Sequence, residues 1–345
     1  MRYIFFLTAL LSAQQLRITE TAGIDRRDEP VTLQIAGAEE TFFVSVDANL
    51  SVTVDSAKLR VRVPELKVTQ AGRVGLKVEN SAFLADLSPR TVDGKEEDSG
   101  TLRGLLIKSH GVLLERARNR MHWAPSFQRD GAKDYTSIAK WDPVQKFSAA
   151  RGRGSLVFTR EGYHALYPEI HLWAEYRFFA SVPYFLFRST MTIEKSIDMY
   201  WLRNQEMTMD DRFTHVAWPG HGGKARIATF DERKPILEKE PIPVDVPWVA
   251  FVNTAKGYGY GAVVLGYKST TTARPVTSIN DGADNGKYWD RRLVDQVRTP
   301  LKPGDRYEEH TAYVVFDCDA KDPLRAFLEW ERKLRHPLRV ELLAK

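Results

Sequence analysis

The chain of 345 residues contains only one cysteine, Cys318. A single cysteine excludes an intrachain disulfide and a Cys-x-x-Cys metal or redox site. Asp317 and Asp319 flank Cys318 at the end of an apolar stretch, and neighbouring carboxylates raise the pKa of a thiol. We therefore expect a buried structural cysteine, no disulfide-linked partner and a fold held together by packing alone.

The motifs of several enzyme classes are also missing. The chain has no Gly-x-Gly-x-x-Gly fingerprint and no phosphate loop ending in Gly-Lys-Ser/Thr, which argues against nucleotide-dependent chemistry. It has neither a His-Glu-x-x-His zinc helix nor a Gly-x-Ser-x-Gly elbow, which argues against zinc proteases and α/β-hydrolases. We assign no cofactor from the sequence.

Neither sign of charge dominates the chain. It carries 50 Lys and Arg against 45 Asp and Glu, a net charge of +5, and the two signs are interleaved. A basic block that would bind nucleic acid is therefore missing, and we expect no nucleic-acid partner. After the N-terminus, no stretch stays uncharged for the roughly 20 residues that a membrane-spanning helix needs. With 43% hydrophobic and 28% charged residues, the composition is typical of a soluble globular protein.

The first residues have the pattern of a signal peptide. Arg2 supplies a positive charge, residues 3–11 are apolar, and Ser12 and Ala13 are small residues in front of Gln14. We predict a signal peptide at 1–13 with cleavage near Ala13, which places the protein in the periplasm or outside the cell. The alternative is that this segment is a first buried β-strand.

Alternating apolar and polar residues dominate the rest of the chain and predict antiparallel β-strands. The clearest hairpin covers 168–195, where an apolar residue stands at every second position on both sides of a turn at 180–183. Each of its strands then has one apolar and one polar face. Further strands are predicted at 248–253, 261–267 and 311–316. The predicted fold class is mostly β, an antiparallel β-sandwich with a short C-terminal helix.

A polar, acidic stretch at 90–100 is typical of a surface loop or of a boundary between two β regions. It would separate an N-terminal β region, 14–92, from a main β region, 101–345, although one continuous domain over 14–345 is the alternative. The only helix expected covers 322–335. Asp322 is a suitable N-cap, Pro323 fits the first helical position, and apolar residues follow at helical spacing.

Tyrosine and histidine side chains mark a first candidate site around the predicted hairpin. Tyr163 and His164 stand just before it, in a predicted exposed loop, and offer a proton donor and a proton acceptor for general acid–base catalysis. His171 lies in phase with Glu175 on the polar face of the hairpin, where both are candidate substrate-binding residues. The alternative is that these are ordinary solvated surface side chains.

The segment 209–223 is the best candidate binding loop. It places Trp218 and His221 close to His215, Asp210 and Asp211. Aromatic faces stack on sugar C–H groups, while carboxylates and imidazoles bond hydroxyls, so this composition suits a saccharide. The alternative is a turn with a structural tryptophan. The two aspartates and His215 could also hold a divalent cation, but their spacing is not diagnostic.

Two more segments combine aromatic and charged residues. His122 and Trp123 begin a long central segment, 122–154, and Tyr288 and Trp289 lie in the charged stretch 281–292. Such loops on a β scaffold often build the rim of a carbohydrate groove, although the same composition is ordinary for a large exposed loop. The sequence does not show whether these segments converge on one cleft.

Two sequence segments resemble exported bacterial proteins with a galactose-mutarotase-like β-supersandwich. They are ETAGIDRRDEPV at 20–31 and EYRFFASVPYF at 175–185. Within these proteins the exo-rhamnogalacturonan lyase group is the nearest comparison. The resemblance implies a two-sheet β-structure whose concave face binds saccharide and acts as a lyase, an epimerase or a non-catalytic binder, because one fold hosts many activities.

A lyase of this kind needs three groups around its substrate. One neutralises the uronate carboxylate, a base removes the neighbouring proton, and an acid protonates the leaving oxygen. We expect Arg177 or Arg188 to neutralise the carboxylate. The base would be His215 or His164, and the acid would be Tyr163 or Tyr288.

We therefore expect an exported polysaccharide lyase that cleaves an acidic, uronate-containing glycan by β-elimination. Its partner would be a polysaccharide or an oligosaccharide. One alternative is a non-catalytic glycan-binding envelope protein. The other is an aldose-epimerase-like enzyme, with His171 or His215 and Glu175 on opposite sides of a free sugar.

Overall fold

The structure is a computed structural model that describes residues 15–343, with gaps at 36, 60–62, 93–94, 98, 116–124, 134, 138–144, 210–211, 272–275 and 283–285. The predicted signal peptide, 1–13, lies outside the described residues. Within the described ranges, no helix is both long and apolar enough to cross a membrane.

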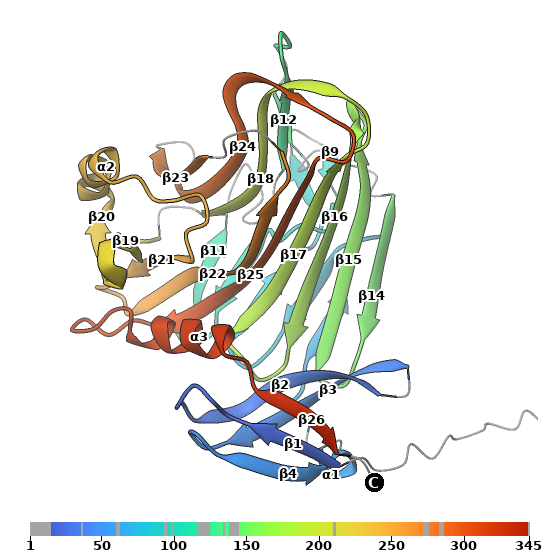
Figure 1. Ribbon diagram of the computed structural model, residues 1–345, viewed down its shortest axis with the longest axis vertical. Coiled ribbons are helices and arrows are strands. Elements are labelled where there is room, and N and C mark those ends of the chain that lie inside the picture. Colours follow the sequence, from blue (N-terminus) through green and yellow to red (C-terminus); the bar gives the residue numbers. More distant parts are fainter. Residues whose placement is uncertain are drawn as a thin grey trace, which may run out of the picture.

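A nine-stranded antiparallel sheet forms the body of the molecule (Figure 1). Its strands are, in spatial order, β14 (Lys146–Arg151), β15 (Ser155–His164), β16 (Tyr167–Phe179), β17 (Tyr184–Ile193), β25 (Arg306–Asp317), β22 (Tyr258–Ser269), β21 (Trp248–Asn253), β19 (His215–Pro219) and β20 (Ala225–Thr229). The predicted hairpin is confirmed as β16 and β17, with its turn at 180–183. From Glu169 to Phe178, even-numbered residues of β16 are buried and odd-numbered ones are half-buried, as alternation along a strand requires.

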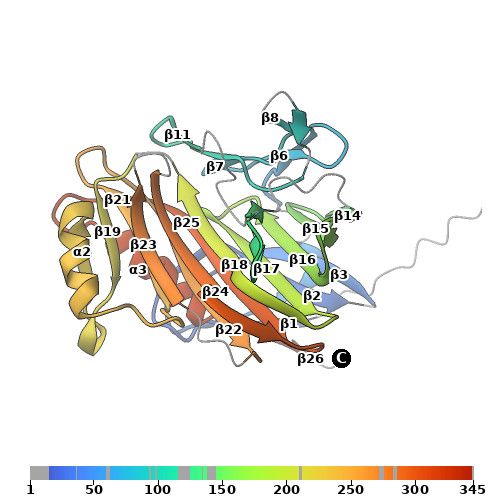
Figure 2. The ribbon, with the colours of Figure 1, turned by 90° about the horizontal axis from the view of Figure 1, so that it is seen from above.

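Two five-stranded sheets pack against the face of the large sheet that we call its inner face. One contains β11 (Val112–Glu115), β10 (Gly104–Ile107), β7 (Phe83–Asp86), β6 (Leu76–Glu79) and β5 (Lys67–Gln70). The other contains β13 (Thr136–Ser137), β12 (Ser126–Arg129), β18 (Ile197–Met209), β24 (Gly286–Leu301) and β23 (Val276–Gly282). A small hairpin joins β8 (Arg90–Val92) and β9 (Lys95–Glu97). Figure 2 shows β6, β7 and β11 as a layer along one side.

A buried ion pair ties the inner face to the second of these sheets. Arg291 on β24 donates from Nη1 to Glu309 Oε1 on β25 at 2.8 Å, and neither side chain is exposed. The hydroxyls of Tyr307 and Thr311 also donate to Glu309, at 2.8 and 3.2 Å. Burial raises the pKa of Glu309 even though Arg291 opposes the shift. The Glu309 carboxylate therefore has the hydrogen bonds that a buried charge needs.

The opposite face of the large sheet, which we call its outer face, carries a helix and a small N-terminal unit. Helix α3 (Arg325–Arg335) packs Phe327 against Trp248 and Phe316, with ring centroids 5.5 and 5.2 Å apart. The predicted C-terminal helix is therefore confirmed, but it begins at Arg325 because residues before Leu324 form turns. The expectation of one helix was wrong: Thr229 and Glu232 form a capping box that starts α2 (Phe230–Lys239).

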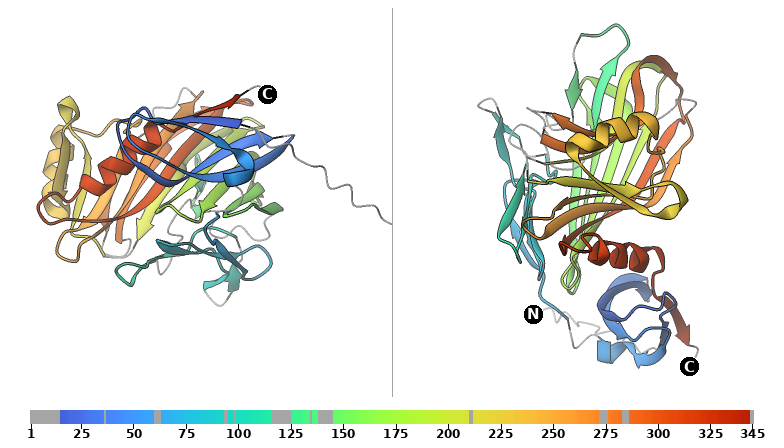
Figure 3. Two further views of the ribbon diagram at one scale, coloured as in Figure 1. Left: turned by 90° about the horizontal axis from the view of Figure 1, so that it is seen from below. Right: turned by 90° about the vertical axis from the view of Figure 1, so that its left-hand side faces the viewer.

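The N-terminal unit joins both ends of the described chain. Its three-stranded sheet has the order β26 (Arg339–Leu343), β1 (Gln15–Thr19) and β4 (Ser51–Asp55). The hairpin of β2 (Arg26–Ile35) and β3 (Ala38–Val46), together with α1 (Ser56–Leu59), completes it. The last strand of the predicted main region thus pairs with the first strand of the predicted N-terminal region. Figure 3 shows this unit below α3 at one end of the molecule.

Arg26 fixes the N-terminal unit to the end of α3. Its fully buried guanidinium donates to the carbonyl oxygens of Lys333 and His336 at 3.2 and 2.6 Å, and to Glu20 Oε1 at 3.3 Å. Burial raises the pKa of Glu20, but the backbone N–H groups of 22–24 and of Asn49 outweigh this effect and lower the pKa to about 2. This polar joint sets the position of β2 over the outer face of the sheet.

Candidate functional site

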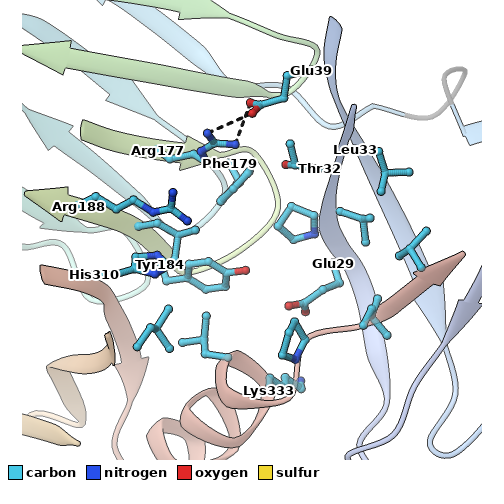
Figure 4. Close-up of a pocket in the computed structure, with 18 of the residues that line it drawn as sticks. Glu29, Thr32, Leu33, Glu39, Arg177, Phe179, Tyr184, Arg188, His310 and Lys333 are labelled. Atoms are coloured by element: carbon cyan, nitrogen blue, oxygen red, sulfur yellow. Dashed lines mark hydrogen bonds and ion pairs between the residues drawn. The ribbon is translucent and has the colours of Figure 1, made fainter. Parts of the chain in front are cut away.

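A cleft of about 650 Å³ lies between β2 and the outer face of the large sheet. Residues 29–33 of β2 form one wall, and the end of α3 with residues 337–340 forms part of another. The floor comes from β16, β17 and β25. Figure 4 shows Arg177, Arg188 and His310 on the side of the sheet and Glu29 on the side of β2. The volume is in the range of small-molecule sites.

Strand register places three of the polar side chains in one row across the floor of the cleft. Glu175 on β16 is the direct partner of Arg188 on β17, and Arg188 is the direct partner of His310 on β25. Directly opposed residues in an antiparallel sheet have Cβ atoms about 4.5–5.5 Å apart. The row therefore presents a carboxylate, a guanidinium and an imidazole within reach of a single bound ring.

The two arginines of the cleft differ in their partners. Arg177 forms an ion pair with Glu39 at 2.8 Å, which bridges the N-terminal unit and the sheet, and lies 3.6 Å from Glu175. Arg188 is exposed, and no carboxylate lies within ion-pair distance of it in the described part of the chain. Its guanidinium is therefore available for an anionic ligand, for which its planar fork is well suited.

A second cavity of about 430 Å³ continues along the outer face and shares Arg188 and His310 with the cleft. It is lined by Trp173 and Thr190, from strands β16 and β17, and by Tyr267 on β22. Trp173 supplies an aromatic surface on which the C–H face of a sugar can stack. The cleft and this second cavity together form what we call the outer-face groove, long enough for more than one sugar ring.

His310 is half-buried in the floor of the groove. Its Nε2 is buried and makes no hydrogen bond within the described ranges. Burial lowers the pKa of His310 to about 4, and the charges of Arg188 and Arg177 act in the same direction. The imidazole is therefore neutral near pH 7 and can accept a proton there.

Glu29 faces the groove from β2. Its side chain is only 9% exposed, and its Oε1 lies 3.6 Å from Arg26 Nη1. Its Oε2 makes no direct hydrogen bond among the described residues. Burial raises the pKa of Glu29, although the charges of Arg26 and Lys333 and the hydroxyl of Tyr184 oppose the shift. Tyr184 is buried on β17, and Figure 4 shows its hydroxyl end directed toward Glu29.

The structure brings three of the predicted site residues together, namely Glu175, Arg177 and Arg188. Two others lie further along the outer face. The rings of Tyr163 and His171 are 5.0 Å apart, Tyr163 donates to Glu194, and His171 bonds Glu161. His171 precedes Glu175 by four residues on one strand, which separates them by about 13 Å.

Three predicted site residues are buried in the core, which corrects the expectation of exposure. His164 is 5% exposed at the end of β15, where it contacts Thr136 and stacks near Phe127. Trp218 and Trp289 are 2% and 0% exposed in the core of the inner face. Each occupies an inward position of its strand, so the large apolar rings serve packing and do not reach a ligand.

The remaining predicted residues do not meet the groove. His215 lies on β19, separated from β17 by β25, β22 and β21, and bonds Thr214. His221 is exposed in a short 3₁₀ turn beyond β19, and Tyr288 lies on β24 in the second layer. His122, Trp123, Asp210 and Asp211 lie outside the described residues. Among the residues described, no group of three His, Cys, Asp or Glu is placed to hold a metal ion.

Sequence reasoning missed Glu29, Trp173, Tyr184 and His310 as site residues. Only Trp173 had a usable signal, because it alternates in phase with Glu175 and Arg177 on the polar face of the hairpin. His310 comes from a strand more than 100 residues later, and the pairing of Arg188 with His310 depends on strand register.

No family model matches the chain, and no curated protein matches it by sequence. Solved structures do match. An alpha-mannosidase from Enterococcus faecalis has a TM-score of 0.58 at 9% identity, covering 96% of this chain and 46% of that one. A glycosyl hydrolase family 38 protein from the same organism has a TM-score of 0.56 at 9% identity, covering 96% of this chain and 47% of that one.

A galactose mutarotase-like protein from Lactobacillus casei also matches, with a TM-score of 0.40 at 10% identity, over 70% of this chain and all of that one. The chain spans less than half the length of the two glycosidase structures. The predicted mostly β, antiparallel fold is confirmed. These structures do not confirm the resemblance to the rhamnogalacturonan lyase group, which stays a prediction.

Proposed function

We propose that this protein binds an acidic saccharide in the outer-face groove. The observation that carries the proposal is the exposed Arg188, which has no ion-pair partner among the described residues and lies beside Glu175 and His310, with Trp173 further along the same groove. A sugar ring would stack on Trp173 while Arg188 binds a uronate carboxylate. That the enzymes it resembles in fold act on carbohydrates agrees with this proposal. We also propose that this binding takes place outside the cytoplasm, as expected from the predicted signal peptide.

The first prediction concerns affinity. Arg188→Ala should weaken the binding of oligogalacturonate by about 10–100-fold, because a hydrogen bond to a charged group contributes about 1.5–3 kcal/mol. Calorimetry on the chain from Gln14 measures this, with a neutral cello-oligosaccharide as the comparison ligand. Arg325→Ala, an exposed arginine on α3, is the matched control and should bind like wild type. Equal affinity of Arg188→Ala and wild type would contradict the proposal.

A β-eliminating lyase is the second candidate, and His310 favours it. A neutral imidazole whose Nε2 has no hydrogen-bond partner among the described residues, beside an arginine that can bind a carboxylate, suits the removal of a proton next to a uronate carboxylate. In this proposal the base is His310, in place of His215 or His164. Arg188 neutralises the carboxylate and so stabilises the charge that develops on it.

The second prediction therefore concerns turnover. The wild-type chain should produce unsaturated uronate from oligogalacturonate or oligoalginate, followed by ultraviolet absorbance. His310→Asn should lower the rate by at least about 100-fold while oligosaccharide affinity stays unchanged. If wild type binds acidic oligosaccharides without any rise in absorbance, the protein is the non-catalytic binder. Conversion of free monosaccharides without cleavage would instead indicate the epimerase.

A further inference from the structure

Two buried polar atoms without a hydrogen-bond partner, among the described residues, line the same cleft. They are Nε2 of His310 on the sheet and Oε2 of Glu29 on β2. A buried polar group that makes no hydrogen bond is costly, and such groups in a native structure call for an explanation, such as a catalytic role. Here these two atoms, His310 Nε2 and Glu29 Oε2, come from opposite sides of one cavity (Figure 4). A bound ligand with hydroxyl groups on both sides would satisfy both.

The surroundings of Glu29 suit a carboxyl group that carries a proton. Its side chain is only 9% exposed, and burying a charged carboxylate costs more free energy than burying a neutral acid. The groups that face it are Arg26 on its own strand, Lys333 on α3 and Tyr184 on β17. Arg26 also binds Glu20 and two carbonyl oxygens, and Lys333 Nζ binds Glu329 at 2.7 Å. Both cations are thus shared with other acceptors.

We propose that Glu29 is the proton donor of the groove and works opposite His310 on an acidic saccharide. This inference rests on the proposed function, because the substrate must first bind to Arg188. The reaction is one elimination. His310 Nε2 takes the proton from C5 of the uronate, and the C5–H electrons form the C4–C5 double bond. The C4–O4 bond breaks, and Glu29 gives its proton to O4 of the leaving sugar.

The proton balance of this step closes without any further reactant. Glu29 ends as a carboxylate and His310 as an imidazolium. A proton then returns through water from the imidazolium of His310 to the carboxylate of Glu29. Tyr184 acts as a positioning residue, because its hydroxyl lies at the Glu29 carboxyl. The role of acid therefore belongs to Glu29 in this proposal and not to Tyr163 or Tyr288, which lie away from the cleft.

The test compares Glu29→Gln with wild type on the same oligogalacturonate and oligoalginate substrates. Gln has the shape of the protonated acid but cannot donate a proton, so the fold and the calorimetric affinity should be kept. The rate of unsaturated product should fall by at least about 100-fold. Tyr184→Phe keeps the buried ring and should lower the rate less than Glu29→Gln.

The pH profile separates an acid from a structural residue. The wild-type rate should rise as His310 loses its proton near pH 4 and fall again when Glu29 becomes ionised, which gives a bell shape. Glu29→Gln should lose the alkaline limb, and Glu29→Asp should restore part of the rate with that limb present. Unchanged turnover in Glu29→Gln, or an unchanged alkaline limb, would overturn the inference, as would a larger loss in Tyr184→Phe. Binding without elimination in wild type would overturn it while leaving saccharide binding intact, whereas no binding at all would contradict the proposed function itself.

Discussion

Replacing Arg291 by methionine should lower the free energy of unfolding by about 3–5 kcal/mol, because breaking a buried ion pair leaves an uncompensated charge in the core. The charge left behind is Glu309, which is fully enclosed between the sheets. Tyr307 and Thr311 would still donate to it, but neither neutralises a carboxylate. Urea denaturation followed by circular dichroism measures the loss.

The same strand offers a matched control for this variant. Arg298 on β24 pairs with Asp198 at 2.7 Å, but its side chain is 67% exposed, so Arg298→Met should lower the free energy of unfolding far less than Arg291→Met. Burial already raises the pKa of Glu309. Without Arg291, Glu309 should take up a proton more readily. The loss of free energy of unfolding in Arg291→Met should therefore be smaller at low pH and larger at high pH. Equal losses for the two variants would contradict the argument.

Replacing Arg26 by methionine should also lower the free energy of unfolding by about 3–5 kcal/mol, since it removes a buried cation from the Glu20 carboxylate. The variant also leaves the carbonyl oxygens of Lys333 and His336 without their donor. Because this joint holds β2 over the sheet, the affinity of the groove for oligogalacturonate should fall together with stability. Denaturation and calorimetry on one preparation measure both quantities.

Arg27 provides the neighbouring control. It is 58% exposed and pairs with Asp25 and Asp47 on the surface. Arg27→Met should therefore change the free energy of unfolding far less than Arg26→Met and leave oligosaccharide affinity unchanged. If Arg26→Met behaved in the same way, the joint would not hold the cleft together.

Local patterns predicted most of the fold. Alternation gave the β16–β17 hairpin together with its turn, because burying one face of a strand imposes a two-residue period on the sequence. The capping box that starts α2 was equally visible, but its helix contains Pro235 and few buried residues, so hydrophobic periodicity did not reveal it. The pairing of β26 with β1 could not be predicted, because no local signal connects strands so far apart in the chain.

The candidate site was predictable only where a single hairpin supplied it. Glu175, Arg177 and Arg188 share the polar face of β16 and β17, and alternation alone places them there. The prediction that His164 is exposed was wrong, because the strand β15 extends to His164 and directs its ring into the core. Glu29 and His310 enter the cleft through the docking of the N-terminal unit and the register of β25, which depend on tertiary packing.

The cleft also has an order of assembly. One wall is β2, close to the start of the chain, and another is formed by the end of α3 and the residues leading into β26. During synthesis the first wall leaves the ribosome well before the second, because the strands of the large sheet lie between them in the sequence. While a nascent chain is still growing, β1 lacks its partner β26 and Arg26 lacks the carbonyl oxygens that it holds. A saccharide therefore meets a formed groove only after the segment that contains α3 and β26 has been synthesised and has docked.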